Sequence, residues 1–281
     1  MTTILKPIEL LWRGVNRLRR ALYRRGILKS RRLPRPVISV GNLAAGGAGK
    51  TPAVIAIARY LDKRGFRVAI LTRGYGRSGS ASGPVTSLDA SRFGDEPVLL
   101  KSKLKNVDVI VGSKRYENAT QFLAQNDCDL FILDDGFQHL QLARDIDVVI
   151  NGGRGVMREG RSALAAADFV IQRNLRLAVP EQVTPRRVFA FSGLADNEQF
   201  FESLRTQGLD VAGTKSFRDH HRYTAADIAA IKEAAGADAI VTTEKDAVKI
   251  DDRDIIAVAA EMIVEPAILE AIAAKISGSV D

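Results

Sequence analysis

The chain is poor in cysteine and lacks long apolar runs, and each shortage excludes a class of protein. One cysteine, Cys128, among 281 residues rules out a disulfide framework. No uninterrupted apolar stretch reaches about 18 residues, so the sequence predicts no membrane-spanning helix. Residues 1–30 also lack the continuous apolar segment of a secretion signal, and we expect the protein in the cytosolic compartment. The chain is 46% hydrophobic and 26% charged, which suffices for a full core and two modest domains.

Acidic residues are nearly absent from the first 36 residues. This segment has eleven lysines and arginines against the single acid Glu9, a net charge of +10, whereas the remaining residues carry −2. The net charge of +8 therefore belongs to an N-terminal appendage and not to the globular body. Apolar residues recur in this appendage at steps of three and four, as in an amphipathic helix. They are Ile4, Ile8, Leu11, Val15, Leu18 and Leu22.

A basic amphipathic helix fits three roles. It can lie in a membrane interface, with its apolar face among acyl chains and its arginines at anionic headgroups. It can instead pack on the protein's own core and leave a solvated basic face. A nucleic-acid-binding arm is the third role, but it needs stacking aromatic residues, and this segment has only Trp12 and Tyr23. We therefore expect no nucleic acid as a partner, and the first two roles stay open.

Glycine is concentrated where a short apolar strand ends. Residues 37–51 predict a buried strand that runs into a glycine-rich loop ending in Gly49-Lys50-Thr51, the layout of a phosphate-binding P-loop. Lys50 would contact the β- and γ-phosphates of a nucleotide, and the Thr51 hydroxyl would ligate Mg²⁺. Ala44 stands where the strict pattern has glycine. The backbone N–H groups that would surround the phosphates belong to Gly46, Gly47, Ala48 and Gly49.

Apolar strands and amphipathic helices alternate along the rest of the chain. We expect an α/β fold, namely a P-loop NTPase-like, mostly parallel sheet followed by a second, smaller α/β domain. The predicted strands are 67–72, 107–111, 130–133, 146–150, 187–192, 209–217, 239–243 and 255–258. The predicted helices are 50–63, 96–103, 116–124, 198–206, 225–235 and 266–276. The proline- and charge-rich residues 175–186 are the expected connector.

This pattern divides the chain into three regions. Residues 1–36 are the basic amphipathic helix and its lead-in, residues 37–175 form the P-loop core domain, and residues 176–281 form the smaller domain. In parallel sheets the ligand site lies beyond the carboxyl ends of the strands. The loops that follow strands are therefore the places to look for functional residues.

Three such loops and one later cluster carry unusual residues. Arg73-Gly74-Tyr75-Gly76-Arg77 fits either phosphate or sugar contacts or an ordinary solvated turn. Gly94-Asp95-Glu96-Pro97, at a predicted helix start, offers a base and a metal ligand, or else simple helix capping. Asp134 and Asp135 follow an apolar strand, the Walker-B placement for holding Mg²⁺. His220, in a polar cluster at 218–222, is either a surface histidine or a catalytic one.

Taken in order, these motifs resemble the tetraacyldisaccharide 4′-kinase family of lipid A biosynthesis, over roughly residues 5–250. The most specific match is Asp134-Asp-Gly-Phe-Gln-His139 together with the P-loop and Gly94-Asp-Glu-Pro97. Four further segments complete it: Val40-Gly-Asn-Leu43, Arg73-Gly-Tyr-Gly76, Phe217-Arg-Asp-His220 and Thr243-Glu-Lys-Asp246.

The resemblance implies a reaction and its setting. The enzyme would use ATP and Mg²⁺ to phosphorylate the 4′-hydroxyl of an acylated glucosamine disaccharide 1-phosphate. It would be a peripheral protein at the cytoplasmic face of the inner membrane, with the N-terminal helix at the membrane surface. The main alternative from another class is a membrane-recruited regulatory P-loop ATPase. That alternative leaves the paired acids at 95–96 and the distant His220 unexplained.

The resemblance also implies roles for individual residues. Asp95 matches the catalytic base, His220 orients it, and Lys50 contacts the phosphates. The metal environment would come from Thr51, Glu96, Asp134 and Asp135. Candidate substrate contacts are Arg73, Tyr75, Arg77 and His139.

Overall fold

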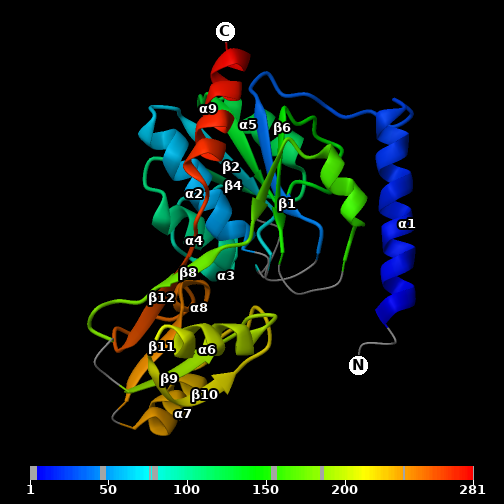
Figure 1. The fold of residues 1–281 in the computed structure, drawn as a ribbon. Coiled ribbons are helices and arrows are strands. Elements are labelled where there is room, and N and C mark those ends of the chain that lie inside the picture. The colour runs from blue at the N-terminus through cyan, green and yellow to red at the C-terminus, as the bar shows by residue number, and fades with distance from the viewer. Residues whose placement is uncertain are drawn as a thin grey trace.

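The computed structural model describes residues 5–44, 49–75, 77, 82–152, 157–183, 187–236 and 238–280. They form two α/β units, with helix α1 (Leu5–Arg24) standing beside the first (Figure 1). The predicted mixture of a mostly parallel sheet, a smaller second α/β unit and an N-terminal helix is confirmed. No helix in the described part of the chain is both long and apolar enough to cross a membrane.

The first unit is built on a seven-stranded sheet in the order β3-β4-β2-β5-β1-β6-β7. Only the short edge strand β3 is antiparallel to its neighbour. The strands are β1 (Val37–Asn42), β2 (Val68–Thr72), β3 (Gly83–Pro84), β4 (Asp108–Val111), β5 (Leu130–Asp134), β6 (Ile146–Asn151) and β7 (Phe169–Gln172). Its helices are α2 (Lys50–Lys63), α3 (Ala90–Phe93), α4 (Asp95–Lys103), α5 (Arg115–Leu123) and the 3₁₀-helix η1 (Arg161–Ala166).

The apolar runs of this unit explain why its sheet is covered on both faces. Every residue of β1, β2 and β5 is buried, as expected when helices pack on both sides of parallel strands. Helix α2 buries one stripe at steps of three and four, formed by Val54, Ile57, Ala58 and Leu61. Because β5 pairs parallel with both β1 and β2, the carboxyl ends of the three strands lie at one edge of the sheet.

The second unit has a five-stranded sheet in the order β10-β9-β11-β12-β8. Its strands are β8 (Leu175–Ala178), β9 (Arg187–Ser192), β10 (Asp210–Ser216), β11 (Ala239–Thr243) and β12 (Ile255–Met262). The remaining helices are α6 (Asn197–Thr206), α7 (Ala225–Ala235), α8 (Glu244–Ala247) and α9 (Pro266–Val280). Strands β9 to β12 are parallel, and β8 pairs antiparallel with β12.

Two features of this part differ from the expectation. Residues 175–186 are not only a connector, because β8 pairs with the extended end of β12, Leu175 opposite Met262. The alternation of Leu175 and Leu177 with Arg176 suits such a strand. Helix α9 turns back to the first unit, where Ile272 and Ile276 join the apolar cluster that contains the buried face of α2. The chain thus crosses between the units twice, and Figure 1 shows α9 beside α2.

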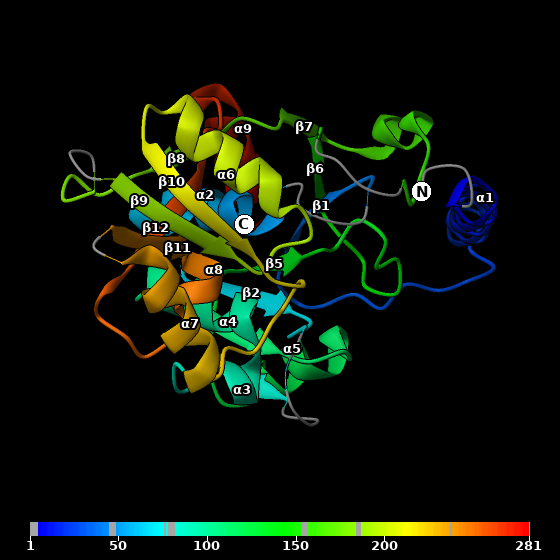
Figure 2. The ribbon, with the colours of Figure 1, turned by 90° about the horizontal axis from the view of Figure 1, so that it is seen from below.

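Helix α1 presents opposite faces to the protein and to solvent. Figures 1 and 2 show it at the edge of the first unit, separated from the sheet by the segment that holds η1. Asn16 and Arg20 are buried toward the protein. The apolar residues on the other side are exposed, namely Leu10, Leu11, Trp12, Val15 and Leu18. The amphipathic pattern therefore buries its polar edge on the core and leaves the apolar face free.

Candidate active site

The P-loop lysine lies at the start of α2, directly after β1. Gly49 precedes it with φ 80°, in the left-handed region that favours glycine. A Cβ at Gly49 would lie 2.7 Å from Met262 Cε, so the loop also passes close to the end of β12. Lys50 Nζ lies 3.3 Å from Asp135 Oδ1 and 3.4 Å from Asn42 Oδ1. Gly46, Gly47 and Ala48 lie outside the described residues.

The adjacent carboxylates at the end of β5 have different surroundings. Asp134 is buried and accepts a hydrogen bond from Thr72 Oγ1 at 3.0 Å. Burial, together with the negative charges of Glu96 and Asp135, raises its pKa to about 7. For Asp135 burial again raises the pKa, but the cations Lys50 and Arg158 outweigh it and the net shift is downward. The ionised form of Asp134 is therefore destabilised by its surroundings, whereas the ionised form of Asp135 is stabilised by two cations.

This pair suits a divalent cation that is completed by a nucleotide. No three acid, histidine or cysteine side chains within the described residues converge tightly enough to hold a metal alone. Mg²⁺ is commonly held by one or two carboxylates plus phosphate oxygens and water, so such a cage is not required. The raised pKa of Asp134 among acidic neighbours marks a place where a cation would relieve repulsion. Thr51, in the first turn of α2, would supply the hydroxyl ligand.

Asp134→Asn should stabilise the metal-free protein. With a folded pKa of about 7, above the usual aspartate value of 3.8, Asp134 binds its proton more tightly when folded, so stability falls as pH rises between these values. We expect the variant to melt about 5 °C higher than wild type at pH 8 in EDTA, by a smaller margin at pH 5, and equally only near or below pH 3.8, where Asp134 holds its proton in both the folded and the unfolded chain. Asp135→Asn is the matched control and should lower Tm, because it leaves Lys50 and Arg158 without their anion. Equal melting temperatures of wild type and Asp134→Asn at pH 8 would contradict the claim that the ionised Asp134 carboxylate destabilises the metal-free protein.

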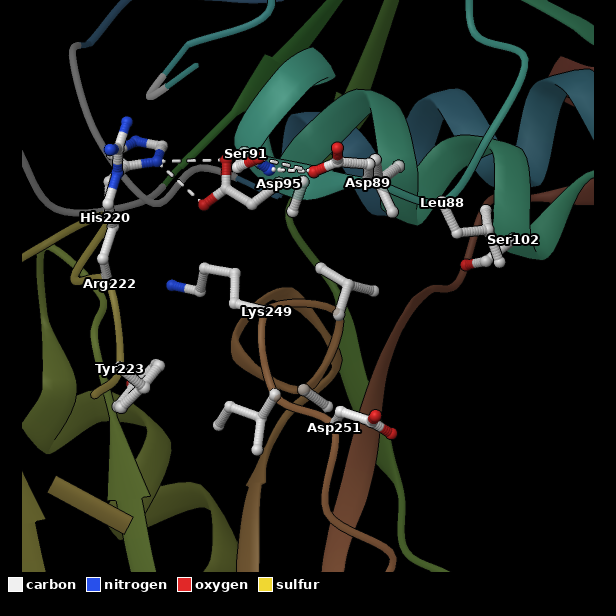
Figure 3. Close-up of a pocket in the computed structure, with 15 residues that line it drawn as sticks. Leu88, Asp89, Ser91, Asp95, Ser102, His220, Arg222, Tyr223, Lys249 and Asp251 are labelled. Atoms are coloured by element: carbon white, nitrogen blue, oxygen red, sulfur yellow. Dashed lines mark hydrogen bonds and ion pairs between the residues drawn. The ribbon is translucent and has the colours of Figure 1, made fainter. Parts of the chain in front are cut away.

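The catalytic candidates Asp95 and His220 meet across the two units, although 125 positions separate them. His220 Nδ1 donates to Asp95, with distances of 2.8 Å to Oδ2 and 3.1 Å to Oδ1 (Figure 3). Asp95 is the first residue of α4 and is buried. Gly94 precedes it with φ 94°, and a Cβ there would lie 2.6 Å from the Tyr75 carbonyl oxygen. Glycine at position 94 therefore lets α4 begin against the loop after β2.

This pair favours an ionised carboxylate. Burial raises the pKa of Asp95, but the hydrogen bond from His220 and the charge of Lys245 outweigh it, so the net shift is downward. The hydrogen bond to Asp95 raises the pKa of His220 despite burial and the nearby lysine. His220 has φ 57°, an uncommon backbone conformation for a non-glycine residue. Its imidazole is thus presented to Asp95 by a constrained loop.

Lys245, in the Thr243-Glu-Lys-Asp246 segment, is a site residue that the sequence pattern does not single out. Its ammonium lies 3.3 Å from His220 Nε2, 3.3 Å from Asp219 Oδ1 and 3.5 Å from Glu96 Oε1. Its pKa is raised, because acidic neighbours outweigh its burial. Glu96 therefore faces Lys245 of the second unit, while its negative charge also contributes to the raised pKa of Asp134. Only membership of a motif could have drawn attention to this lysine.

Asp246 and His221 have structural partners. The buried carboxylate of Asp246 accepts from Gly193 N, Thr243 Oγ1 and Lys249 Nζ. His221 stacks on Phe217 with ring centroids 4.6 Å apart, and its Nε2 lies 3.1 Å from Asp227, which caps α7. The two residues fix the loops after β9, β10 and β11. Of the adjacent histidines, only His220 is brought to Asp95.

The candidate substrate residues gather around an arginine that the sequence analysis overlooked. Arg115, the first residue of α5, is buried, and desolvation plus the charge of Arg73 lower its pKa to about 10. Burial, then Arg115 and Arg73, lower the pKa of His139 to about 4. Within the described residues, Arg77 Nη1 and Arg115 Nε are buried without hydrogen-bond partners. Such a cluster of guanidinium groups suits an anionic ligand.

Arg115 lies four residues after the end of β4, whereas Arg73 follows β2 directly, so only its place beyond a strand end could have drawn attention to it. Tyr75 lies at the other end of this group. Its exposed ring is 5.4 Å from the His220 ring, centroid to centroid. The structure therefore joins the loop after β2 both to the arginine cluster and to the Asp95–His220 pair.

A cavity of 620 Å³ between the units opens beside this pair (Figure 3). Its walls include Asp89, Val98 and Tyr223. Figure 3 shows Lys249 projecting into the space from the second unit. The two units thus meet around the Asp95 carboxylate without filling the volume next to it.

Comparison with known proteins identifies the family. The model of the family described as tetraacyldisaccharide-1-P 4′-kinase matches residues 1–184 and 173–277. This chain belongs to that family. A tetraacyldisaccharide 4′-kinase from Pelobacter propionicus is 40% identical over an alignment that covers 89% of this chain and 83% of the relative. The enzyme of that name from Desulfotalea psychrophila is 38% identical over 87% of each chain.

A solved member of the family has the same fold. The "apo" form of LpxK from Aquifex aeolicus in complex with ATP matches with a TM-score of 0.80 at 29% identity, over 99% of this chain and 98% of that one. The family resemblance drawn from the motifs is therefore confirmed. That relative is in complex with ATP, whereas the metal and the roles of the individual site residues in this chain stay predictions.

Proposed function

We propose that this chain transfers the γ-phosphoryl group of ATP to the 4′-hydroxyl of a tetraacylated glucosamine disaccharide 1-phosphate in lipid A biosynthesis. The observation that carries the proposal is the buried Asp95 carboxylate, which is hydrogen-bonded to His220 of the second unit and lies next to Glu96, whose charge acts on Asp134. A sugar hydroxyl that attacks phosphorus needs a positioned proton acceptor, and an ionised carboxylate steadied by imidazole supplies one. A regulatory ATPase would have no use for this pair.

In this proposal, different residues bind the phosphates, the metal and the lipid and accept the proton. Lys50 and the P-loop backbone hold the β- and γ-phosphates, and Lys50 stabilises the charge that develops during transfer. Thr51, Asp134 and Asp135, with Glu96 nearby, would hold Mg²⁺, which when bound would neutralise phosphate charge. Asp95 accepts the hydroxyl proton, and His220 orients the carboxylate. Arg73, Arg115 and His139 contact the anionic, sugar-bearing part of the lipid, with Tyr75 and Arg77 beside them.

The three regions serve different partners in this proposal. Residues 1–36 contact the membrane, residues 37–175 bind ATP, and residues 176–281 deliver His220, although α9 packs back on the ATP-binding unit. The two crossings, at β8 and after β12, would let the second unit close over the nucleotide and exclude water.

The proposal is tested by product analysis. Purified protein is incubated with γ-labelled ATP and vesicles that carry the acylated disaccharide 1-phosphate, and lipid is extracted. We expect label in the lipid, at the 4′ position. Release of labelled inorganic phosphate with no labelled lipid would instead favour the regulatory ATPase.

We also propose that α1 lies on the cytoplasmic face of the inner membrane as a peripheral anchor. Support comes from its free apolar face and from the arginines around it. Such a helix buries its apolar side at the level of the headgroups, while basic residues attract anionic lipid.

Leu18→Asp should weaken this anchor without affecting the fold. Leu18 is 60% exposed, so its loss removes no packing, but a carboxylate there would enter the acyl region. We expect flotation with anionic vesicles to fall by about tenfold at low salt. Leu88→Asp is the matched control, since Leu88 is 58% exposed on a different surface, and it should float like wild type. Equal flotation of the two variants would contradict the anchor.

A further inference from the structure

Two polar residues on the inner edge of α1 attach the helix to the segment that precedes η1. Asn16 and Arg20 are four positions apart and therefore share one face of the helix. Asn16 Nδ2 donates to the Arg158 carbonyl oxygen at 2.9 Å. Arg20 donates to both carboxylate oxygens of Glu159, at 2.8 and 3.0 Å. The helix is thus seated on two consecutive residues, Arg158 and Glu159.

The seat is buried and extends to the motif after β5. The Arg20 guanidinium lies 4.3 Å from the centre of the Phe137 ring and donates to the Phe137 carbonyl oxygen at 3.2 Å. Gln138 Nε2 donates to Glu159 Oε1 at 3.1 Å. Arg20 and Glu159 are both almost fully buried. Phe137 and Gln138 are the residues that follow the carboxylate pair by two and three positions.

The same segment reaches the nucleotide site through Arg158. Its Nη1 lies 3.2 Å from Asp135 Oδ2 and 3.4 Å from Gln138 Oε1. Its backbone N–H donates at 2.7 Å to the carbonyl oxygen of Leu43, which follows β1. Asp135 in turn lies 3.3 Å from Lys50 Nζ. Polar contacts therefore run without a break from α1 through Arg158 and Asp135 to the P-loop lysine.

These contacts are better suited to transmitting position than to holding a helix. A buried ion pair is often no more stabilising than apolar side chains of similar volume, so anchoring alone would not require Arg20 and Glu159. Asp135 also has φ 52°, a backbone conformation that is uncommon for a non-glycine residue, although aspartate adopts it more readily than most. Arg158 and Lys50 contact its carboxylate in this conformation. Movement of the Arg158 side chain would therefore change the position of the Asp135 carboxylate.

We propose that α1 is coupled to the nucleotide site, with Arg158 as the positioning residue that links the seat of the helix to Asp135 and Lys50. Nucleotide binding and docking of α1 then stabilise each other, because coupling between two sites is reciprocal. The apolar face of the same helix is free, so lipid contact and nucleotide binding act on opposite sides of one element. The inference rests on the proposed function for the placement of ATP beside Lys50.

Hydrogen exchange measured by mass spectrometry tests the coupling in the full-length protein in detergent micelles. Exchange is compared with and without saturating ATP and Mg²⁺, in peptides that cover α2 and α1. We expect ATP to slow exchange in α2, which it contacts, and to slow exchange in residues 10–24 of α1 by about fivefold. The apolar face of α1 is covered by detergent both with and without ATP. A change in the exchange rate of α1 therefore reports a change in its contacts with the protein core.

Arg158→Met should separate the protection of α2 by ATP from the protection of α1. The Arg158 side chain is partly exposed and Asp135 keeps Lys50, so we expect a folded protein in which ATP still protects α2 but no longer protects α1. Arg161→Met, an exposed arginine three residues further along, is the matched control and should behave like wild type. A simple structural role for Arg158 would change exchange in α1 equally with and without ATP.

Each other outcome overturns a defined statement. If ATP protects α2 of the wild type and leaves α1 unchanged, the coupling is absent and the proposed function stands. If the Arg158→Met variant keeps the ATP-dependent protection of α1, Arg158 is not the link. If ATP fails to protect α2 of the wild type, the nucleotide assignment fails, and the proposed function fails with it.

Discussion

Asp95→Asn is expected to lower kcat for lipid phosphorylation by about 10³ while ATP affinity changes by less than about threefold. The amide keeps the shape of the carboxylate and can still bond to His220, but it cannot accept the hydroxyl proton. ATP affinity is retained because the phosphates are held by Lys50 and the P-loop. The measurement is steady-state kinetics on vesicles, together with equilibrium binding of ATP.

A matched control lies in the wall of the same cavity. Asp89 caps α3, accepting from Ser91 N and Arg92 N, so Asp89→Asn alters an acid at a neighbouring helix start. This variant should retain near-normal kcat. If Asp95→Asn mainly raised the Mg²⁺ concentration needed for half-maximal rate, Asp95 would be a metal ligand and not the proton acceptor.

Lys50→Met is expected to lower kcat by about 10² to 10³ and to weaken ATP binding, with the protein still folded. In the proposed function the Lys50 ammonium stabilises charge on the transferring phosphoryl group. Among the described residues, Lys50 and Arg158 are the two cations paired with Asp135. Methionine keeps an aliphatic side chain of similar length and removes only the charge, so the fold should persist. Rates come from the labelled-ATP assay, and folding is followed by Tm.

Lys63→Met provides the comparison at the opposite end of the same helix. Lys63 is exposed in the last turn of α2, so the variant changes the charge of the helix without reaching the P-loop. It should be indistinguishable from wild type in rate. Turnover by Lys50→Met close to that of Lys63→Met would contradict the placement of the nucleotide.

Local sequence signals predicted many elements of both units. The helix Lys50–Lys63 follows from a P-loop at one end and an apolar stripe at the correct spacing, and both ends agree with the structure. Strands such as Ala239–Thr243 and helix Ala225–Ala235 are equally local, since apolar runs and a Thr224 capping box define them. Elements whose bounds depend on their own residues are predictable in this way.

Features that depend on distant partners were not predicted, namely strand β8 and the packing of the predicted helix α9 on the first unit. Strand β8 is short and contains Arg176, and it becomes a strand because the end of β12 lies alongside it. Helix α9 was assigned to the second unit by its place in the chain, but its apolar face fits the first. No local pattern contains this information, because both features are decided by packing between segments about 85 or more residues apart.

The same division applies to the site. Carboxylates and the P-loop lysine stand out in the sequence, since their chemistry is tied to motifs at strand ends. Arg115, Arg158 and Lys245 do not, because an arginine or lysine in sequence looks like solvated surface until burial and neighbouring charges are known. The structure therefore adds mainly cations to a site whose anions were visible beforehand.

The central claim is that two units assemble one catalytic pair, and a double-variant cycle on Asp95 and His220 tests it most directly. His220→Asn is the suitable partner for Asp95→Asn, because asparagine tolerates the positive φ at position 220. If His220 acts only through Asp95, the single His220 variant should lose about 10- to 100-fold in kcat, and the double variant should be scarcely slower than Asp95→Asn. Losses that multiply would show independent roles and would contradict the pair.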